Sequence, residues 1–252
     1  MAESIDPTVP LDDIFKQTVT YHGREYQQYA IENNVYFSPI DEDEAERLQI
    51  ANEALKKIFD NRLVFPPVRR LRNVLDCGFG TGAWALEVAA QYPRCEVCSL
   101  AIFFSFFFDF FQTPKRLARS GGRAAKQPGQ ASVATNDKRV AKHPFVCFTF
   151  DTGEFDLVHS QMVAGGIDAG RWRTYLKDIH RVLRPGGWCQ IVEIYYQAQS
   201  DNGSLTDEHG LRYWSKLYLQ SLSQYKDPRA PIRMETLVRN AGFTDVETRI
   251  RV

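Results

Sequence analysis

The stretch "VLDCGFGTGAWALEVA" holds the residues of this sequence whose types and spacing best suit chemistry. It places an acid, Asp76, two positions before three glycines at alternate positions, Gly78, Gly80 and Gly82. Glycines let a backbone turn sharply and approach a ligand with no side chain in the way. A carboxylate beside such a turn would repel a phosphate group and attract a ligand with an ammonium or sulfonium charge. The stretch therefore predicts a loop that binds a positively charged organic ligand.

The residues around this loop predict the elements that position it. A short apolar run ends at Asp76, and an apolar helix is expected from Ala83 to Gln91. Strand, glycine turn and helix in this order form a nucleotide-binding crossover, whose helix points its free amides into a crevice. The glycine pattern alone is a weak signal, because Gly78, Gly80 and Ala83 also fit the dinucleotide fingerprint GxGxxA. A nicotinamide-dependent reductase stays open on these residues, although the acid at position 76 opposes it.

Strand and helix patterns alternate over most of the chain, which predicts an α/β fold with a mainly parallel sheet. An amphipathic helix is expected over residues 41–60, with Leu48, Leu55 and Ile58 on its inward face, and a short helix with a loop before it. The later predicted elements are a strand at 154–162, a helix within 170–187 that Pro185 and two glycines stop, a strand at 188–196, two helices within 205–225 and 230–243, and a strand at 244–250.

Composition and charge set limits on the class of protein. The chain has 252 residues with 31 basic and 31 acidic side chains, so the net charge gives no reason to expect nucleic acid or an anionic membrane as partner. Five cysteines without a regular framework suit a reducing compartment, and the acidic start lacks the features of a leader peptide. No run is long enough to span a bilayer. We expect a cytoplasmic or nuclear protein that needs no metal.

Four segments resemble motifs of one enzyme family. "VLDCGFGTGAWALEVA" resembles motif I of the class I S-adenosylmethionine-dependent methyltransferases, "FDLVHSQM" their fourth strand, "RVLRPGGW" the turn into their fifth, and "AGFTDVETR" the entry to their sixth. "YFSPIDEDEAERLQIANEAL" further resembles the fungal branch related to regulators and tailoring enzymes of secondary metabolism. The resemblance covers roughly residues 21–100 and 148–250. It implies a Rossmann-like doubly wound sheet, S-adenosylmethionine as cofactor, and a small-molecule metabolite or a protein as methyl acceptor or partner.

The resemblance also assigns roles to residues. It implies that Asp76 orders the methionine part of the cofactor and that the glycines line its adenosyl side. The full set implied for cofactor binding is Asp76, Gly78, Phe79, Gly80, Thr81, Gly82 and Ser160. His159 and Glu193, at the ends of two predicted strands, are candidate catalytic residues, because a histidine there could take a proton from an acceptor. Tyr36, Trp214 and Tyr218 are weaker candidates to roof the pocket.

The sequence departs from the family pattern at two places. The family carries an acid about 20 residues past the glycine loop that binds the ribose hydroxyls, and Ala101 stands at that position. Residues 101–145, a phenylalanine run followed by a basic stretch, keep neither helical nor strand periodicity. We hypothesise that this segment is foreign to the fold, the alternative being a diverged strand with a surface loop.

The chain also ends without the family's final antiparallel strand. These departures leave a catalytically impaired remnant that binds no cofactor as the competing interpretation. We expect a helical N-terminal extension or lid over residues 1–66 and a methyltransferase domain over 67–252.

Overall fold

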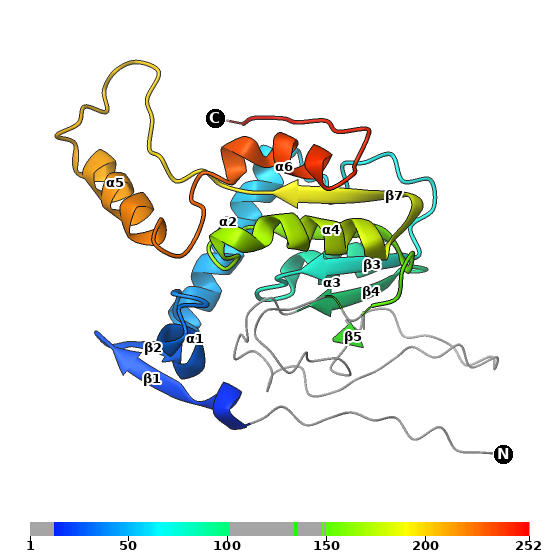
Figure 1. Ribbon diagram of the computed structural model, residues 1–252, viewed down its shortest axis with the longest axis horizontal. Helices are drawn as coiled ribbons and strands as arrows, with labels where there is room; N and C mark the ends of the chain where they lie inside the picture. The colour runs from blue at the N-terminus through cyan, green and yellow to red at the C-terminus, as the bar shows by residue number, and fades with distance from the viewer. Residues whose placement is uncertain (1–12, 101–133, 136–147, 149, 252) are drawn as a thin grey trace.

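The computed structural model of the chain describes residues 13–100, 134–135, 148 and 150–251. Its centre is a parallel sheet of five strands in the order β5-β4-β3-β6-β7 (Figure 1). The strand order runs outward from β3 in one direction and from β6 in the other, so the connections reverse between these two strands. Such a reversal leaves a crevice at the carboxyl ends of the strands, where open α/β sheets bind ligands. The prediction of a Rossmann-like α/β fold is confirmed.

The glycine loop lies between a strand and a helix, as expected. β3 spans Asn73–Cys77, α3 spans Ala83–Gln91, and β4 spans Glu96–Leu100 and pairs with β3 in parallel. β3 is buried on both faces because helices cover both sides of the sheet. The loop between Cys77 and Ala83 therefore opens at the carboxyl edge of the central strand.

Two hydrophobic clusters fill the layers on either side of the sheet. On one face, Trp84 and Val88 of α3 pack with Val74 of β3. On the other face, the helix α4 (Trp172–Val182) packs Leu176 and Ile179 against the sheet, and both side chains are fully buried. α4 connects β6 (Phe155–Gln161) to β7 (Leu183–Val192). The alternation of apolar side chains along the strands thus matches the two helical layers.

The boundary between α4 and β7 lies slightly before the predicted stop at Pro185. The helix ends at Val182, and Leu183 is already extended and pairs with Phe155. Pro185 contributes to this stop, because a proline disfavours helical backbone at the residue before it. The next pair in the register is Leu157 with Trp188, so residues 184–187 form a bulge.

The N-terminal extension contains a hairpin that the sequence reading missed. β1 (Thr18–Tyr21) and β2 (Arg24–Gln27) pair antiparallel and are followed by the short helix α1 (Gln28–Glu32). His22 and Gly23 both have positive φ, 52° and 76°, which is the backbone of a two-residue hairpin turn. The extension is therefore not wholly helical. Its long helix α2 (Glu42–Ile58) forms as predicted, although Ile58 is 47% exposed rather than inward.

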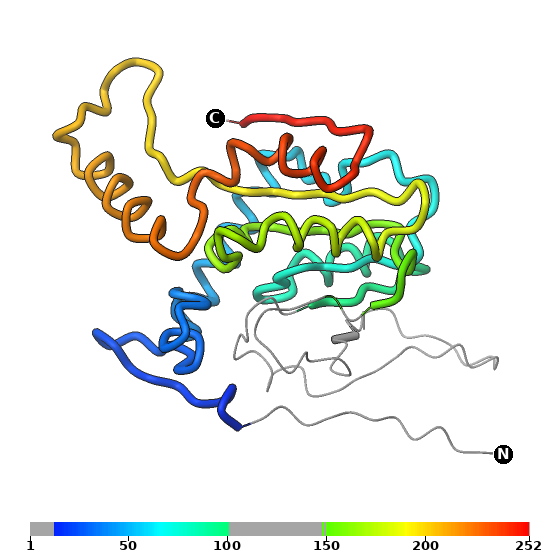
Figure 2. The backbone as a smooth tube through the Cα atoms, in the orientation of Figure 1, coloured from blue at the N-terminus to red at the C-terminus, as the bar shows by residue number. Residues whose placement is uncertain are grey.

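The chain leaves the sheet after β7 and returns to it. Figure 2 shows the segment after β7 leading away to α5 (Gly210–Leu222) and the following residues returning to α6 (Met234–Asn240). The predicted strand at 244–250 is wrong, since these residues carry no strand pairing. Instead, Arg239 of α6 donates hydrogen bonds to the carbonyls of Thr244 and Val246, which hold the segment beside the helix. Within the described residues, the sheet ends at β7.

Little of residues 101–145 is described. Ala134–Thr135 form β5 and pair with Cys98 and Ser99 of β4, so a two-residue strand stands where the family has its third. The rest of the hypothesis about residues 101–145, including Ala101, lies outside the described residues. No helix within the described ranges combines the length and apolarity that a membrane span requires.

Candidate functional site

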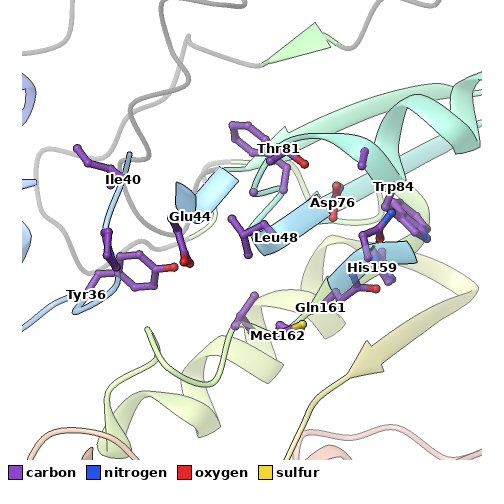
Figure 3. Close-up of a pocket in the computed structure, with 17 residues that line it drawn as sticks. Tyr36, Ile40, Glu44, Leu48, Asp76, Thr81, Trp84, His159, Gln161 and Met162 are labelled. Carbon is purple, nitrogen blue, oxygen red and sulfur yellow. Dashed lines mark hydrogen bonds between the residues drawn. The ribbon is translucent and has the colours of Figure 1, made fainter. Parts of the chain in front are cut away.

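A cleft opens at the carboxyl ends of β3 and β6, at the reversal of the strand order (Figure 3). Three parts of the chain supply its walls: the N-terminal extension, the glycine loop with the start of α3, and the end of β6. The lining residues are Tyr36, Pro39, Ile40, Glu44, Leu48, Asn52, Asp76, Gly78, Phe79, Gly80, Thr81, Ala83, Trp84, His159, Gln161, Met162 and Val163. Most residues predicted to bind a cofactor therefore meet in one place.

The glycine loop adopts a backbone that requires glycine. Gly78, Gly80 and Gly82 have φ values of 75°, 53° and 77°, all in the left-handed region that side chains disfavour. The amide of Gly78 donates to the carbonyl of Leu100, and the amide of Gly82 donates to the carbonyl of Phe79. These bonds fix the turn. Gly82 caps α3 without a side-chain hydrogen bond, so the first amides of that helix are left for a ligand.

Asp76 is a buried carboxyl group without a partner. Its side chain lines the cleft, is 3% exposed, and makes no hydrogen bond or ion pair with any described residue. Burial raises the pKa of Asp76 to about 7, because its charged form loses its hydration. An isolated buried carboxylate is unfavourable, whereas a cationic group in the cleft would offset that cost. This position suits the cationic ligand that the sequence predicts.

His159 is placed as a neutral hydrogen-bond donor rather than as a free base. Its ring stacks on Trp84 with the centroids 3.7 Å apart, and it is 1% exposed. Burial lowers the pKa of His159 to about 3, so the imidazole stays neutral. The side-chain amide of Gln190 donates to Nδ1 at 3.2 Å, which assigns the ring proton to Nε2. Nε2 has no partner among the described residues.

A row of buried polar side chains crosses the sheet at this level. The strand register places Ser99 beside Asp76, Asp76 beside His159, and His159 beside Gln190. Gln190 is fully used, since it accepts from the amide of Phe65 and donates to a backbone carbonyl and to His159. The hydroxyl of Ser99 and Nε2 of His159 have no partner among the described residues. Buried polar groups are usually satisfied, so these atoms mark a place where a ligand or water belongs.

The helix α2 forms a wall that the sequence reading did not assign to the site. Glu44, Leu48 and Asn52 are spaced four residues apart and face the cleft together. Gln161 of β6 donates to the amide oxygen of Asn52 at 3.3 Å, while Nδ2 of Asn52 has no partner among the described residues. The four-residue spacing could have shown from the sequence that these side chains share one face of the helix. Only Leu48 is apolar, however, so only Leu48 was predicted to point inward.

The other predicted residues are placed differently. The hydroxyl of Ser160 lies on the opposite face of the sheet and bonds with the hydroxyl of Tyr175 at 2.8 Å, so a cofactor contact at Ser160 would have to come from its backbone. The carboxyl of Glu193 accepts from the amides of Val163 and Ala164 at 2.9 and 3.3 Å. Burial raises the pKa of Glu193 to about 8. Glu193 thus holds the loop after β6 instead of lining the cleft.

The three aromatic candidates separate into two groups. Tyr36 lines the cleft, and burial raises its pKa. Trp214 and Tyr218 of α5 are not among the lining residues and stack on each other with their ring centroids 5.3 Å apart. The described residues also contain no group of three or more metal-ligating side chains.

A family model described as a methyltransferase domain matches residues 47–248. The chain belongs to this methyltransferase family. The matched range contains the cleft residues from Leu48 to Val163, so the family's own region builds the glycine loop and the end of β6. Tyr36, Ile40 and Glu44, which also line the cleft, precede the matched range. The reading of the sequence as a methyltransferase is confirmed.

Curated relatives of this methyltransferase come from fungi. The secondary metabolism regulator laeA of Aspergillus fumigatus is 29% identical over 241 residues, covering 90% of this chain and 54% of the relative. The protein-methionine methyltransferase laeA of Emericella nidulans is 29% identical over 246 residues, covering 92% of this chain and 54% of the relative. The chain thus spans about half the length of these curated relatives. The predicted link to the fungal secondary-metabolism branch is confirmed.

A solved structure also resembles this methyltransferase. Human N-acetylserotonin methyltransferase in complex with SAM is 18% identical, with a TM-score of 0.49, over 88% of this chain and 59% of that one.

The residues of the cleft fit S-adenosylmethionine. Asp76 would face the cationic methionine part, and the glycine loop would let the backbone approach the adenosyl part closely. Two buried donors without described partners, Nδ2 of Asn52 and Nε2 of His159, are left to meet ligand oxygens or nitrogens. When bound, the cofactor supplies an electrophilic methyl group. The protein's part is to hold donor and acceptor in line.

Proposed function

We propose that this chain transfers a methyl group from S-adenosylmethionine to the sulfur of a methionine in a protein acceptor. The observation that carries the methyl-donor part is the glycine loop with three positive φ values beside a buried, unpaired carboxyl at Asp76. This pair suits a cationic ligand and opposes the phosphates of a nicotinamide cofactor. An intact loop also argues against the remnant that binds no cofactor.

The acceptor part rests on the described lining residues other than Asp76, whose carboxylate is assigned to the cationic methyl donor. None of these other residues offers a free general base. His159 is neutral and uses Nδ1 to accept from Gln190, and Glu44 is paired with Arg47 through two hydrogen bonds of 2.6 and 2.7 Å. A site whose one unpaired carboxylate is taken by the methyl donor suits a nucleophile that has no proton to lose. A thioether sulfur attacks the methyl carbon with a lone pair and becomes a sulfonium as the donor's carbon–sulfur bond breaks. One relative is named a protein-methionine methyltransferase, which supports the same choice.

The relatives named as regulators of secondary metabolism support a role for the chain in that process. Such a role would be consistent with the predicted cytoplasmic or nuclear location. The acceptor would then be a protein that controls the process rather than a metabolite.

Two separate measurements test the proposal. Calorimetric titration of the full chain with S-adenosylmethionine should give micromolar affinity, and NADPH should not bind. Incubation with a donor that carries a deuterated methyl group and with protein extract should then place the label on methionine, as read by peptide mass spectrometry. If the donor binds but the label appears on lysine, on an oxygen or on a small molecule, only the assignment of methionine as the acceptor would be overturned. No donor binding by the folded chain would overturn the whole function.

A further inference from the structure

We propose that a groove lined by four arginines binds an acidic or phosphorylated segment of a partner protein. This arginine groove is formed by Arg69, Arg70, Arg72 and Arg184 and has a volume of about 460 Å³. Arg72 directly precedes β3, and Arg184 is the second residue of β7. The groove therefore lies at the amino ends of the parallel strands, whereas the methyl-donor cleft lies at their carboxyl ends.

A buried carboxylate fixes the groove in place. Asp156 has a side chain that is 4% exposed, and its Oδ1 lies 2.5 Å from Nη1 of Arg184. Its Oδ2 accepts from the backbone amides of Arg72 and Asn73 at 2.5 and 3.1 Å. The carbonyl of Arg70 lies 3.5 Å from Nη2 of Arg184. One guanidinium and the backbone of the adjoining loop are thus held before any ligand arrives, which lowers the entropy lost on binding.

The groove carries an excess of positive charge. Arg69, Arg70 and Arg72 are exposed and make no ion pair with any described residue. The nearby acids Glu96 and Glu154 contact this region through their backbones, to Arg72 and to Asn73, and not through carboxylate pairs with the groove. The carboxylate of Asp156 neutralises the charge of one of the four guanidinium groups, that of Arg184. Guanidinium groups bind carboxylates and phosphates through paired hydrogen bonds, so an anionic ligand would relieve the repulsion among them.

The distribution of charge favours a short protein segment over a nucleic acid. The whole chain carries 31 basic and 31 acidic residues, so its net charge gives no general attraction for a polyanion, and the groove itself is lined by four arginines. Binding of a nucleic acid backbone uses many phosphate contacts along an extended surface. Arginine clusters of this size recognise phosphorylated or acidic motifs in proteins. Phosphate and carboxylate share this chemistry, and the experiment separates them.

Fluorescence anisotropy of labelled peptides tests the proposal on the full chain. Three peptides of one sequence would carry two phosphoserines, two glutamates or two serines. We expect the phosphoserine peptide, the glutamate peptide or both to bind in the micromolar range, with affinity falling as salt is raised, and the serine peptide not to bind. The variant R69Q/R70Q/R72Q should lose at least tenfold in affinity. The matched control R173Q/K177Q/R229Q removes three exposed positive charges outside the groove and should bind like the wild type.

Several results would overturn the proposal. They are no binding of either anionic peptide at millimolar concentration, an equal loss in both triple variants, or tighter binding of a single-stranded oligonucleotide of the same charge. The single variant R69Q guards against misfolding of the triple variant and should lose affinity by a few-fold. S-adenosylmethionine binding should be unchanged in every variant, because the groove and the cleft share no residues.

Discussion

At the scale of single residues, cofactor binding depends on the protonation state of Asp76. Burial raises the pKa of Asp76 to about 7 in the free protein, so much of the carboxyl group is protonated below neutral pH. A cationic ligand needs the charged form. We therefore expect the affinity for S-adenosylmethionine to rise with pH between about 5 and 7 and then level off, with proton release on binding below pH 7. Asp76→Asn should lower the affinity roughly 10- to 100-fold, as for a lost hydrogen bond to a charged group.

The same group links stability to pH. Because the pKa of Asp76 in the folded state lies above the unfolded value of 3.8, the unfolded chain loses its proton first as pH rises. The free energy of unfolding should then fall by up to about 1.4 kcal/mol per pH unit between the two pKa values, and Asp76→Asn should lack this contribution. Urea unfolding of both variants at pH 5, 6 and 7 measures the difference. Glu193 is present in both proteins, so its own pH-dependent contribution to stability cancels in the comparison. Parallel pH profiles would contradict the assigned pKa.

Gly80 supplies a second test at this scale. Its φ of 53° strains any other residue, and an added Cβ would lie 3.8 Å from Cδ1 of Leu48, between the loop and α2. Gly80→Ala should lower the free energy of unfolding by about 1–2 kcal/mol, the cost of the left-handed region. It should also weaken cofactor binding, because the methyl group enters the cleft. Gly210→Ala is the control, since its Cβ meets no atom within 4 Å and its φ is not positive.

Thermal unfolding and calorimetry of the two glycine variants check this prediction. A cofactor affinity for Gly80→Ala equal to that of Gly210→Ala would mean that the loop does not contact the cofactor.

Residue roles were harder to predict than residue positions. Asp76 and His159 were expected at the crevice, and both line the cleft. Their chemistry was not readable from the sequence, since the tautomer of His159 depends on Gln190, 31 residues away, and on burial against Trp84. Ser160 faces the other side of the sheet because neighbouring strand residues alternate between faces.

At the scale of elements, the strongly periodic ones were predicted and those defined by distant partners were not. α3 begins and ends at the predicted residues, and α2 lies within its predicted range. The hairpin of β1 and β2 depends on two positive φ values at His22 and Gly23, a weak sequence signal without asparagine or aspartate. The predicted last strand fails because strand pairing requires a partner, and Arg239 binds its carbonyls instead.

A buried lysine joins elements that no local pattern connects. Lys226 is fully buried, and its Nζ lies 2.5 Å from the carboxylate of Asp168, 2.9 Å from the carbonyl of Val35 and 3.4 Å from that of Gly166. It thereby holds the segment that carries Tyr36 against the loop after β6. Lys226→Met would leave these acceptors without a donor.

We expect Lys226→Met to lower the free energy of unfolding by about 2–4 kcal/mol, somewhat below the usual cost of breaking a buried pair, because Asp168 is 32% exposed. The control Lys16→Met breaks an exposed pair with Asp13 and should leave the free energy of unfolding nearly unchanged. Urea unfolding at neutral pH compares the two. Similar small losses would show that the buried lysine does not hold the N-terminal segment in place.

At the scale of the whole molecule, two parts of the chain share one site. The sheet and glycine loop supply the floor, and the extension covers it with Tyr36, Ile40 and α2. The extension is tied to the rest of the chain at several points. The backbone amide of Phe65 donates to the side-chain oxygen of Gln190 at 2.8 Å, and the carbonyl of Val35 accepts from Nζ of Lys226 at 2.9 Å. The predicted division into a lid over residues 1–66 and a domain over 67–252 remains a prediction that this arrangement allows us to test.

Removal of residues 1–40 separates the lid from the floor, because it deletes the hairpin, α1 and the wall at Tyr36 and Ile40 while α2 and the sheet remain. The shortened chain should still fold, since both hydrophobic clusters lie within residues 63–243. Its affinity for S-adenosylmethionine should fall about tenfold, near 1.4 kcal/mol, through exposure of the cofactor to water. Circular dichroism and calorimetry of the full and shortened chains measure both effects. An unchanged affinity would show that residues 1–40 do not cover the bound cofactor. Loss of the cooperative unfolding transition would mean that they are part of the core instead.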